Sequence, residues 1–100
     1  MNQVILVGRV KSEIKFIKEE STGVRKAIVD LEIQISKSQQ ECGSLTVPLF
    51  LSAKMAIISG DVLEVGKMIA IKGYLTVNHS LLEVHVEKLS FINTQQNSFS

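Results

Sequence analysis

The chain has 100 residues, a net charge of +1 and 45% hydrophobic residues, which is the composition of one small domain. A domain of this size buries only about two-thirds of the surface that its unfolded chain exposes, so association with further copies would help to stabilise it. The near-neutral charge excludes a strongly basic nucleic-acid binder, and no apolar run approaches the roughly 18 residues of a membrane-spanning helix.

The single cysteine, Cys42, excludes an internal disulfide framework and fits a reducing compartment. The N-terminal residues lack the basic and apolar regions of a secretory signal. We therefore expect a cytoplasmic protein that is not attached to a membrane.

The first predicted strand covers residues 3–10, QVILVGRV. It is apolar on both faces, which is typical of a strand that is buried on both sides. Gly8 would allow the strand to bend, and residues 14–18 would continue it beyond the bend. A turn at residues 20–23 leads to a strand at 27–35, where the alternation of apolar and polar residues predicts a half-buried strand.

The middle of the chain is predicted to contain a loop, a strand and the single helix. Residues 36–44 are polar and aperiodic, which predicts a mobile loop. In the strand at 45–52, Pro48 is compatible only with a sheet edge or a bulge. The helix at 54–63 is expected to be about two turns long, because Gly60 weakens its middle.

The longest predicted strand covers residues 65–78, and the rest of the chain is organised around it. Its residues alternate between a core face and a solvent face. Gly66 suits a turn with positive φ, and Gly73 suits the corner of a barrel. A turn at residues 78–80 follows.

The last strand is predicted at residues 81–92. Its inward-facing positions change parity between Val86 and Leu89, which indicates a bulge near Glu87 and Lys88. Five strands with one short helix between the third and fourth are typical of the all-β, oligonucleotide-binding (OB) fold, a five-stranded Greek-key barrel. The barrel domain would cover residues 1–92, and the polar tail at 93–100 is expected to be disordered.

A succession of short stretches also carries a family resemblance. The stretches are NQVILVGRV at 2–10, TGV at 22–24, the Ala-x-Val-x-Leu alternation at 27–31, VGKMIAIKGYL at 65–75 and VEKLSFI at 86–92. In this order and spacing they resemble bacterial single-stranded DNA-binding proteins, and the chain is also similar to primosomal replication protein N of the same superfamily. The resemblance implies an OB fold, sequence-independent binding of single-stranded DNA in replication, recombination or repair, and assembly into a homo-oligomer.

The sequence departs from the family's pattern at several positions. Gln3 stands where the family usually has arginine, and Ser52 and Ser80 stand where aromatic residues stack on bases. The acidic, phenylalanine-ended tip that recruits partner proteins is absent, because no acidic residues precede Phe99. These departures imply weaker binding per subunit and no recruitment of partners through such a tip.

Two aromatic residues, Phe50 and Tyr74, are the best candidates for stacking on bases. Both lie at solvent-facing positions of neighbouring predicted elements, where a core aromatic residue is not expected. In the alternative, Phe50 covers the helix or a subunit interface and Tyr74 is a surface residue. Phe16 and Phe91 are instead predicted to belong to the core.

Basic residues around this face are candidates for contacts with phosphates. Residues 9–26 hold six basic and three acidic side chains, an excess of three positive charges. The alternative is that these lysines and arginines are simply solvated. The candidates are Lys15, Lys18, Arg25, Lys26, Lys54, Lys67 and Lys72.

The first strand is also the predicted subunit interface. In the resembling families, subunits pair through this strand by extending their sheets across a twofold axis. The interface residues would be Val4, Ile5, Leu6 and Val7. A dimer is the minimum, and a tetramer built from two such dimers is favoured.

No catalytic motif is found, since the chain lacks a P-loop, an HExxH motif and a carboxylate pair in an apolar setting. His79 and His85 are too far apart in the sequence to suggest a metal site, so we predict neither a metal nor a cofactor. Two alternatives to a general single-stranded DNA-binding protein stay open. They are a primosomal-type replication accessory protein and an OB-fold subunit for protein interaction that has lost DNA binding.

Overall fold

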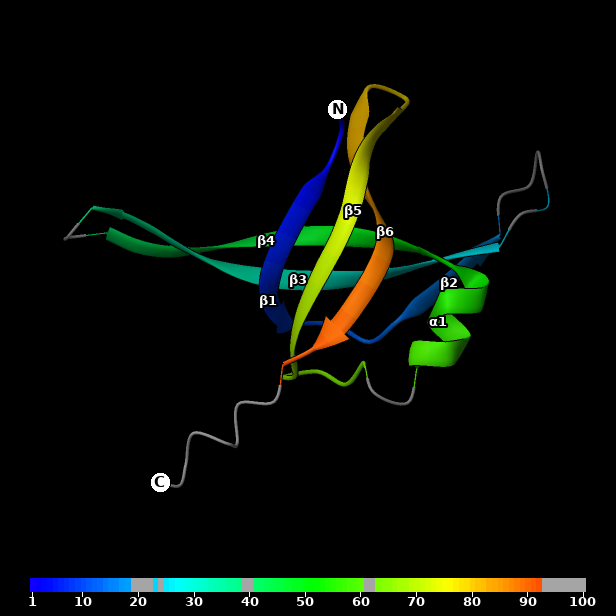
Figure 1. The fold of residues 1–100 in the computed structure, drawn as a ribbon, viewed down its shortest axis with the longest axis horizontal. Helices are drawn as coiled ribbons and strands as arrows, with labels where there is room; N and C mark the ends of the chain where they lie inside the picture. The colour runs from blue at the N-terminus through cyan, green and yellow to red at the C-terminus, as the bar shows by residue number, and fades with distance from the viewer. Residues whose placement is uncertain (19–22, 24, 39–40, 61–62, 93–100) are drawn as a thin grey trace.

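The computed structural model describes residues 1–18, 23, 25–38, 41–60 and 63–92. The described residues form six strands and one helix. The strands are β1 (Val4–Val10), β2 (Lys15–Lys18), β3 (Arg25–Ser38), β4 (Glu41–Ser52), β5 (Met68–Asn78) and β6 (Leu81–Phe91), and the helix is α1 (Ala53–Ser59). In Figure 1, β1, β5 and β6 lie side by side and cross β3 and β4.

Five of these strands close into a barrel. The sheet order is β1-β5-β6-β4-β3-β2, and β1 also pairs with β3, so that the ring closes and β2 lies outside it. Both β1 and β2 pair antiparallel with β3, and β2 is therefore the predicted continuation of the first strand beyond its bend. The structure confirms the all-β OB barrel with one short helix, which lies between β4 and β5 in the chain.

Two junctions of the ring are short, and we call them seams. The β1–β3 seam is antiparallel and the β4–β6 seam is parallel. The paired residues are Arg9 with Glu32 and Val10 with Leu31 at the first seam, and Leu49 with Val84 and Phe50 with His85 at the second. The β3–β4 and β5–β6 hairpins, in contrast, pair along most of their lengths.

Alternation along the strands builds the core, as the sequence predicts for residues 27–35 and for the first half of β5. Two glycines allow strands to approach closely at its edge. A Cβ atom at Gly73 would collide with the backbone oxygen of His85, and one at Gly8 with that of Glu32. The buried core residues are Val10, Ala27, Val29, Leu31, Leu49, Leu51, Ala56, Leu63, Ile69, Ile71, Val84 and Val86.

The predicted bulge, the turn at Gly66 and the turn at residues 78–80 are confirmed, whereas residues 20–22 of the turn predicted at 20–23 lie outside the described residues. The β5–β6 register shifts by one residue beside Gly73, which leaves Glu87 of β6 without an opposite residue. Gly66, in the turn ahead of β5, has a φ of +97°. His79 and Ser80 have φ values of 53° and 67° in the turn between β5 and β6, which is the backbone of a tight hairpin turn.

The helix is short, as predicted. It begins after Ser52, whose hydroxyl accepts a hydrogen bond from the backbone N–H of Met55 at 3.2 Å, and it ends at Gly60. In the described part of the chain no helix has the length and apolar character needed to cross a membrane. The predicted tail at 93–100 lies outside the described residues.

The prediction of a loop at residues 36–44 is wrong for most of that segment. β3 continues to Ser38 and β4 begins at Glu41, and the two strands form the long arm in Figure 1. The arm forms because backbone pairing between adjacent strands does not require apolar side chains. Residues 39–40 lie outside the described residues.

Several apolar side chains are more exposed than the sequence predicts. Ile5 and Val7 of β1 are 69% and 46% exposed in the single chain, so that β1 is buried on one face only. Phe16 and Phe91 are 57% and 44% exposed and are not core residues. Phe16 lies on β2, outside the barrel, and Phe91 is the last residue of β6.

The β5–β6 hairpin extends beyond the barrel, beside the N-terminus (Figure 1). In this part of the hairpin, the side chains on the face that continues the core have no opposite strands to pack on. Val77 and Leu82 are exposed for this reason. The side chain of Asn2 lies against the hairpin, since its Nδ2 donates to the oxygen of Leu75 at 2.7 Å and its Oδ1 accepts from the N–H of Leu75 at 2.9 Å.

Candidate nucleic-acid interface

Three aromatic rings form a row across the outer face of the barrel. Tyr74 on β5 lies opposite His85 on β6, which lies opposite Phe50 on β4. The ring centroids of Tyr74 and His85 are 5.4 Å apart with an interplanar angle of 16°, and those of His85 and Phe50 are 5.5 Å apart with an angle of 20°. We call this row the aromatic ladder.

The ladder lies on the outer face because successive side chains of a strand point to opposite faces of the sheet. His85, for example, lies between Val84 and Val86, which both enter the core. The ladder crosses the β4–β6 seam, so it joins the two hairpins of the barrel through side chains where the backbone pairing is short.

The middle ring of the ladder is fixed by a hydrogen-bonded chain. Nε2 of His85 donates to Oε1 of Glu83 at 3.0 Å, since a carboxylate can only accept. The other carboxylate oxygen of Glu83 accepts from Nδ2 of Asn78 at 3.3 Å. The side chains of Glu83 and His85 are only 12% and 21% exposed, which limits competition from water.

The ladder lines a groove of about 200 Å³, which we call the ladder groove. Arg25 and Lys26 of β3 also line it, together with Ser52 at the end of β4. Two predicted cations therefore lie beside the two predicted stacking residues, Phe50 and Tyr74. Lys15 lies on the same row of the sheet, because it pairs with a β3 residue, Ile28, that pairs in turn with Phe50.

Two pairs of like charges lie on neighbouring strands. Lys18 of β2 is opposite Arg25 of β3, and Lys72 of β5 is opposite Lys88 of β6. Like charges in directly opposite positions destabilise a sheet. A phosphate bound near either pair would reduce this repulsion, which makes both pairs suitable for contact with a polyanion.

The structure does not bring Lys67 to this surface. Lys67 lies in the turn before β5 and contacts Glu64 across 4.0 Å. Tyr74 is seven positions further along the chain, which is about 23 Å of extended chain. Lys54, on α1, lies beside a second groove instead.

Sequence reasoning missed His85 and Lys88 as members of this surface. The sequence pattern offers His85 only as a candidate metal ligand, and it predicts that the strands of Phe50 and Tyr74 are neighbours. In the structure β6 lies between those strands. The inward-facing Val84 and Val86 are the signal that could have placed His85 outside. Within the described residues, no group of three or more His, Cys, Asp or Glu side chains could hold a metal ion.

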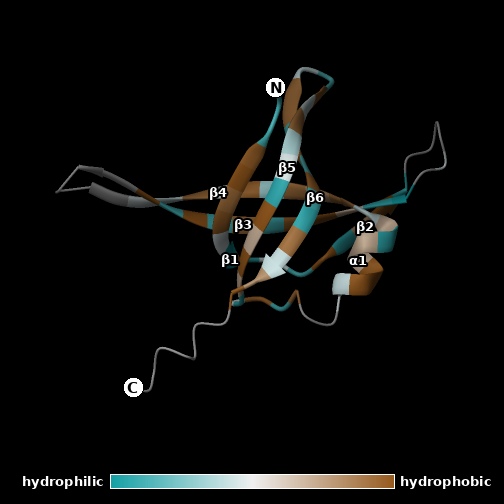
Figure 2. Cartoon of the chain, in the orientation of Figure 1, coloured by the Kyte–Doolittle hydropathy of each residue, from teal (hydrophilic) through white to brown (hydrophobic). Residues whose placement is uncertain are grey.

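β1, the predicted subunit interface, has an open edge. It pairs with β5 along Val4–Arg9, but with β3 only at its end. Its other edge, ahead of that contact, has no strand partner in the described part of the chain. Ile5 and Val7 point outward, whereas Val4 and Leu6 pack partly on the core. Figure 2 shows β1 as hydrophobic along most of its length.

Neither a family model nor a curated protein matches the sequence. The structure, in contrast, matches a single-stranded DNA-binding protein (SSB) from Plasmodium falciparum, solved in complex with single-stranded DNA, with a TM-score of 0.73, 15% sequence identity, and coverage of 93% of this chain and 96% of that chain. The fold is that of SSB proteins.

Two further solved structures support this assignment of the SSB fold. The small single-stranded DNA-binding protein from Streptomyces coelicolor has a TM-score of 0.71 and 17% identity, with coverage of 92% of this chain and 94% of that chain. The protein priB from Ralstonia solanacearum has a TM-score of 0.70 and 19% identity, with coverage of 92% and 99%. The resemblance stated from the sequence is thereby confirmed at the level of the fold.

Proposed function

We propose that this protein binds single-stranded DNA without sequence preference, in DNA replication, recombination or repair. The aromatic ladder is the observation that carries this proposal. Every base has a π-face, so stacking on aromatic rings accepts any sequence. No catalytic step is part of the proposal, and a cytoplasmic location stays a prediction from the sequence.

In this mechanism the bases stack on the outer rings of the ladder, Phe50 and Tyr74, while phosphates contact the cations beside them. Arg25 and Lys26 lie on the β3 side of the ladder groove. The pair of lysines on β5 and β6 lies along the same two strands as Tyr74 and the middle ring. Stacking and charge neutralisation therefore act on adjacent parts of one strand of DNA.

We further propose that the working species is a homo-oligomer. Two stacked bases supply about 2–6 kcal/mol, whereas micromolar affinity requires about 8 kcal/mol. A net charge of +1 limits the contribution of phosphate contacts, so a DNA strand that crosses several subunits is the simpler route to useful affinity. The open edge of β1 and its exposed Ile5 and Val7 support pairing through Val4–Val7, in a dimer or in a tetramer of two such dimers.

The fold comparison supports the proposal without carrying it, because one fold can serve many functions. The Plasmodium falciparum SSB was solved with single-stranded DNA. The outer face of this chain supports the proposal separately from the fold, because it carries aromatic rings and cations at positions that the sequence predicts to face solvent.

A second candidate function follows from the β5–β6 hairpin. Val77 and Leu82 pair across the hairpin and are both exposed near its end, and adjoining apolar side chains on a surface are typical of protein contacts. This observation favours an OB-fold subunit for protein interaction, or a primosomal-type accessory protein. Either would differ from the first candidate in its affinity for DNA.

Fluorescence anisotropy with a labelled oligo(dT) of about 16 nucleotides, the upper site size of one OB fold, tests the proposal. We expect a mixed-sequence single strand to bind as tightly as oligo(dT), and a duplex of the same length to bind much more weakly. In a salt series, the logarithm of the affinity should fall with the logarithm of salt concentration by about 0.7 per phosphate contact. Equal affinity for duplex, or a flat response to salt, would contradict the proposal.

A further inference from the structure

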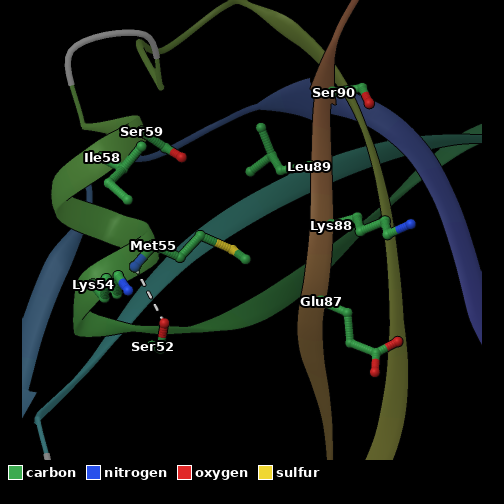
Figure 3. Close-up of a pocket in the computed structure, with 9 residues that line it drawn as sticks. All are labelled: Ser52, Lys54, Met55, Ile58, Ser59, Glu87, Lys88, Leu89 and Ser90. Carbon is green, nitrogen blue, oxygen red and sulfur yellow. Dashed lines mark hydrogen bonds between the residues drawn. The ribbon is translucent and has the colours of Figure 1, made fainter.

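A second groove, of about 510 Å³, separates α1 from β6, and we call it the helix groove. Figure 3 shows the side chains of Met55 and Leu89 extending into the gap from opposite sides, with Ile58 next to them on the helix. Ser52 and Ser90 add hydroxyl groups at its rim. Its volume is within the range of about 300–1,000 Å³ that is typical of sites for small organic groups.

The groove exists because β4 and β6 separate beyond their seam. Their parallel pairing ends at Phe50 and His85, after which β4 runs into α1 while β6 continues alongside β5. The bulge at Glu87 lies at this point of separation. Past the seam, no described strand pairs with the edge of β6 that faces α1, so this edge forms one wall of the groove.

The helix groove adjoins the ladder groove. Ser52 lines both. On β6, Val86 lines the ladder groove and the next residue, Glu87, lines the helix groove. A strand of DNA that leaves the ring of Phe50 in this direction therefore reaches the helix groove next.

The charge of the helix groove also suits a polyanion. Its lining residues include Lys54 on the helix and Glu87 and Lys88 on β6. In Figure 3 the side chain of Lys88 points away from α1, toward β5, so that Lys54 is the cation on the helix side. A base between the two walls would have its phosphate within reach of Lys54 at the helix rim.

We propose that the helix groove is a second nucleotide subsite, which receives a base of the DNA strand after that strand has passed the aromatic ladder. Met55, Ile58 and Leu89 provide the apolar surface for the base, and Lys54 contacts its phosphate. This inference rests on the proposed function and adds a location to it. An extended peptide paired with the edge of β6 is the competing occupant.

The chain contains no tryptophan, so a single introduced tryptophan reports on one place. Ile57 and Ile58 are both 71% exposed on α1, but only Ile58 lines the helix groove. The variants Ile58→Trp and Ile57→Trp are therefore a matched pair. Each is titrated with oligo(dT), while anisotropy of a label on the DNA reports total binding. We expect the fluorescence of Ile58→Trp to be quenched at least about twofold more strongly than that of Ile57→Trp, because stacking on a base quenches the indole.

A second pair of variants measures affinity. Ile58→Asp should weaken oligo(dT) binding by about tenfold through charge repulsion in the groove, and Ile57→Asp should leave it nearly unchanged. Equal quenching and equal affinities within both pairs, with DNA binding intact, would overturn the subsite while leaving the proposed function in place, and the groove would then be open to a peptide. If no variant and no wild-type protein binds DNA by anisotropy, both the proposed function and the subsite fail.

Discussion

Nε2 of His85 lies 3.0 Å from Oε1 of Glu83, and this hydrogen bond fixes the middle ring of the aromatic ladder. The imidazole stacks on Tyr74 on one side and on Phe50 on the other. Because β6 separates β5 from β4, the histidine ring lies between these two rings and contacts both of them. We therefore interpret His85 as a positioning residue for the two proposed stacking residues.

Replacing Tyr74 or Phe50 by alanine should weaken binding of single-stranded DNA by about 1–3 kcal/mol, which is the measured range for one stacked base. Isothermal titration or anisotropy measures this loss. The melting temperature should change little, since neither ring belongs to the buried core. Phe16→Ala is the control, because Phe16 is exposed but lies on β2, outside the ladder. If Phe50→Ala lowers the melting temperature and the remaining folded protein binds normally, Phe50 belongs to the packing of the barrel or of a subunit interface instead.

Substitutions at His85 and Glu83 should distinguish the contribution of the His85 ring to DNA binding from that of its hydrogen bond. We expect His85→Ala to weaken DNA binding by about 1 kcal/mol or more, since it removes a ring from the ladder, and His85→Phe to retain most of the affinity. Glu83→Gln keeps the shape of the side chain and its ability to accept a hydrogen bond, so it should have a smaller effect than His85→Ala. Equal affinities for His85→Ala and His85→Phe would show that the middle ring has no role in binding.

The lysine pair on β5 and β6 leads to a prediction in which stability and binding change in opposite directions. Lys72→Ala removes the repulsion from Lys88, so the free energy of unfolding should rise by a few tenths of a kcal/mol. The same variant should bind DNA more weakly, and its salt slope should fall by about 0.7 if one phosphate contact is lost. Lys67→Ala is the matched control, because Lys67 lies away from the ladder beside Glu64. An unchanged salt slope in Lys72→Ala would remove this lysine from the interface.

Gly73 should not tolerate a side chain. A Cβ atom there would collide with the backbone of His85, which cannot move without disturbing the β5–β6 pairing. We expect Gly73→Ala to lower the free energy of unfolding by about 1–3 kcal/mol, as overpacking does, measured by urea denaturation. Gly43→Ala is the control, because a Cβ atom at Gly43 would meet no other atom within 4 Å, and its effect should stay within about 0.5 kcal/mol. Similar losses in the two variants would mean that glycine is needed for backbone freedom rather than for close approach.

Light scattering at micromolar concentration tests the proposed oligomer. Two or four chains of 11.0 kDa would give about 22 or 44 kDa. Ile5→Glu places a charge on the exposed face of β1 and should shift the mass toward 11.0 kDa. Ile57→Glu, at an equally exposed position on α1, should not change the mass. An 11.0 kDa wild-type species that still binds DNA tightly would refute the need for assembly.

Local patterns in the sequence predicted the barrel well. Alternation placed the strands, Gly66 and the turn at His79 marked their ends, and the parity change in β6 revealed the bulge at Glu87. These features depend on residues that are close in the chain, and a single sequence carries that information.

The long-range features could not be predicted in the same way. The arm at residues 36–38 and 41–44 forms through backbone pairing that the polar sequence does not signal. The exposure of Ile5 depends on whether another element covers the outer face of β1, and the role of His85 depends on the strand order that brings β6 between β4 and β5. The alternation of side chains along their strands is enough to identify Phe50 and Tyr74 as candidates. His85, which lies between them, belongs to a third strand, β6, and the pattern of the other two strands does not reveal where β6 lies in the sheet.

The two short seams divide the barrel into halves that are each well paired internally. Transient opening of a barrel is easiest where the fewest backbone hydrogen bonds must break, so amide protons at the seams should exchange with solvent before those in the centre of either hairpin. The aromatic ladder spans one of these seams. A ligand stacked along the ladder should therefore slow the opening of the barrel at the β4–β6 seam. The β1–β3 seam would then be the remaining point of opening, and it contains the strand, β1, through which a second subunit would pair.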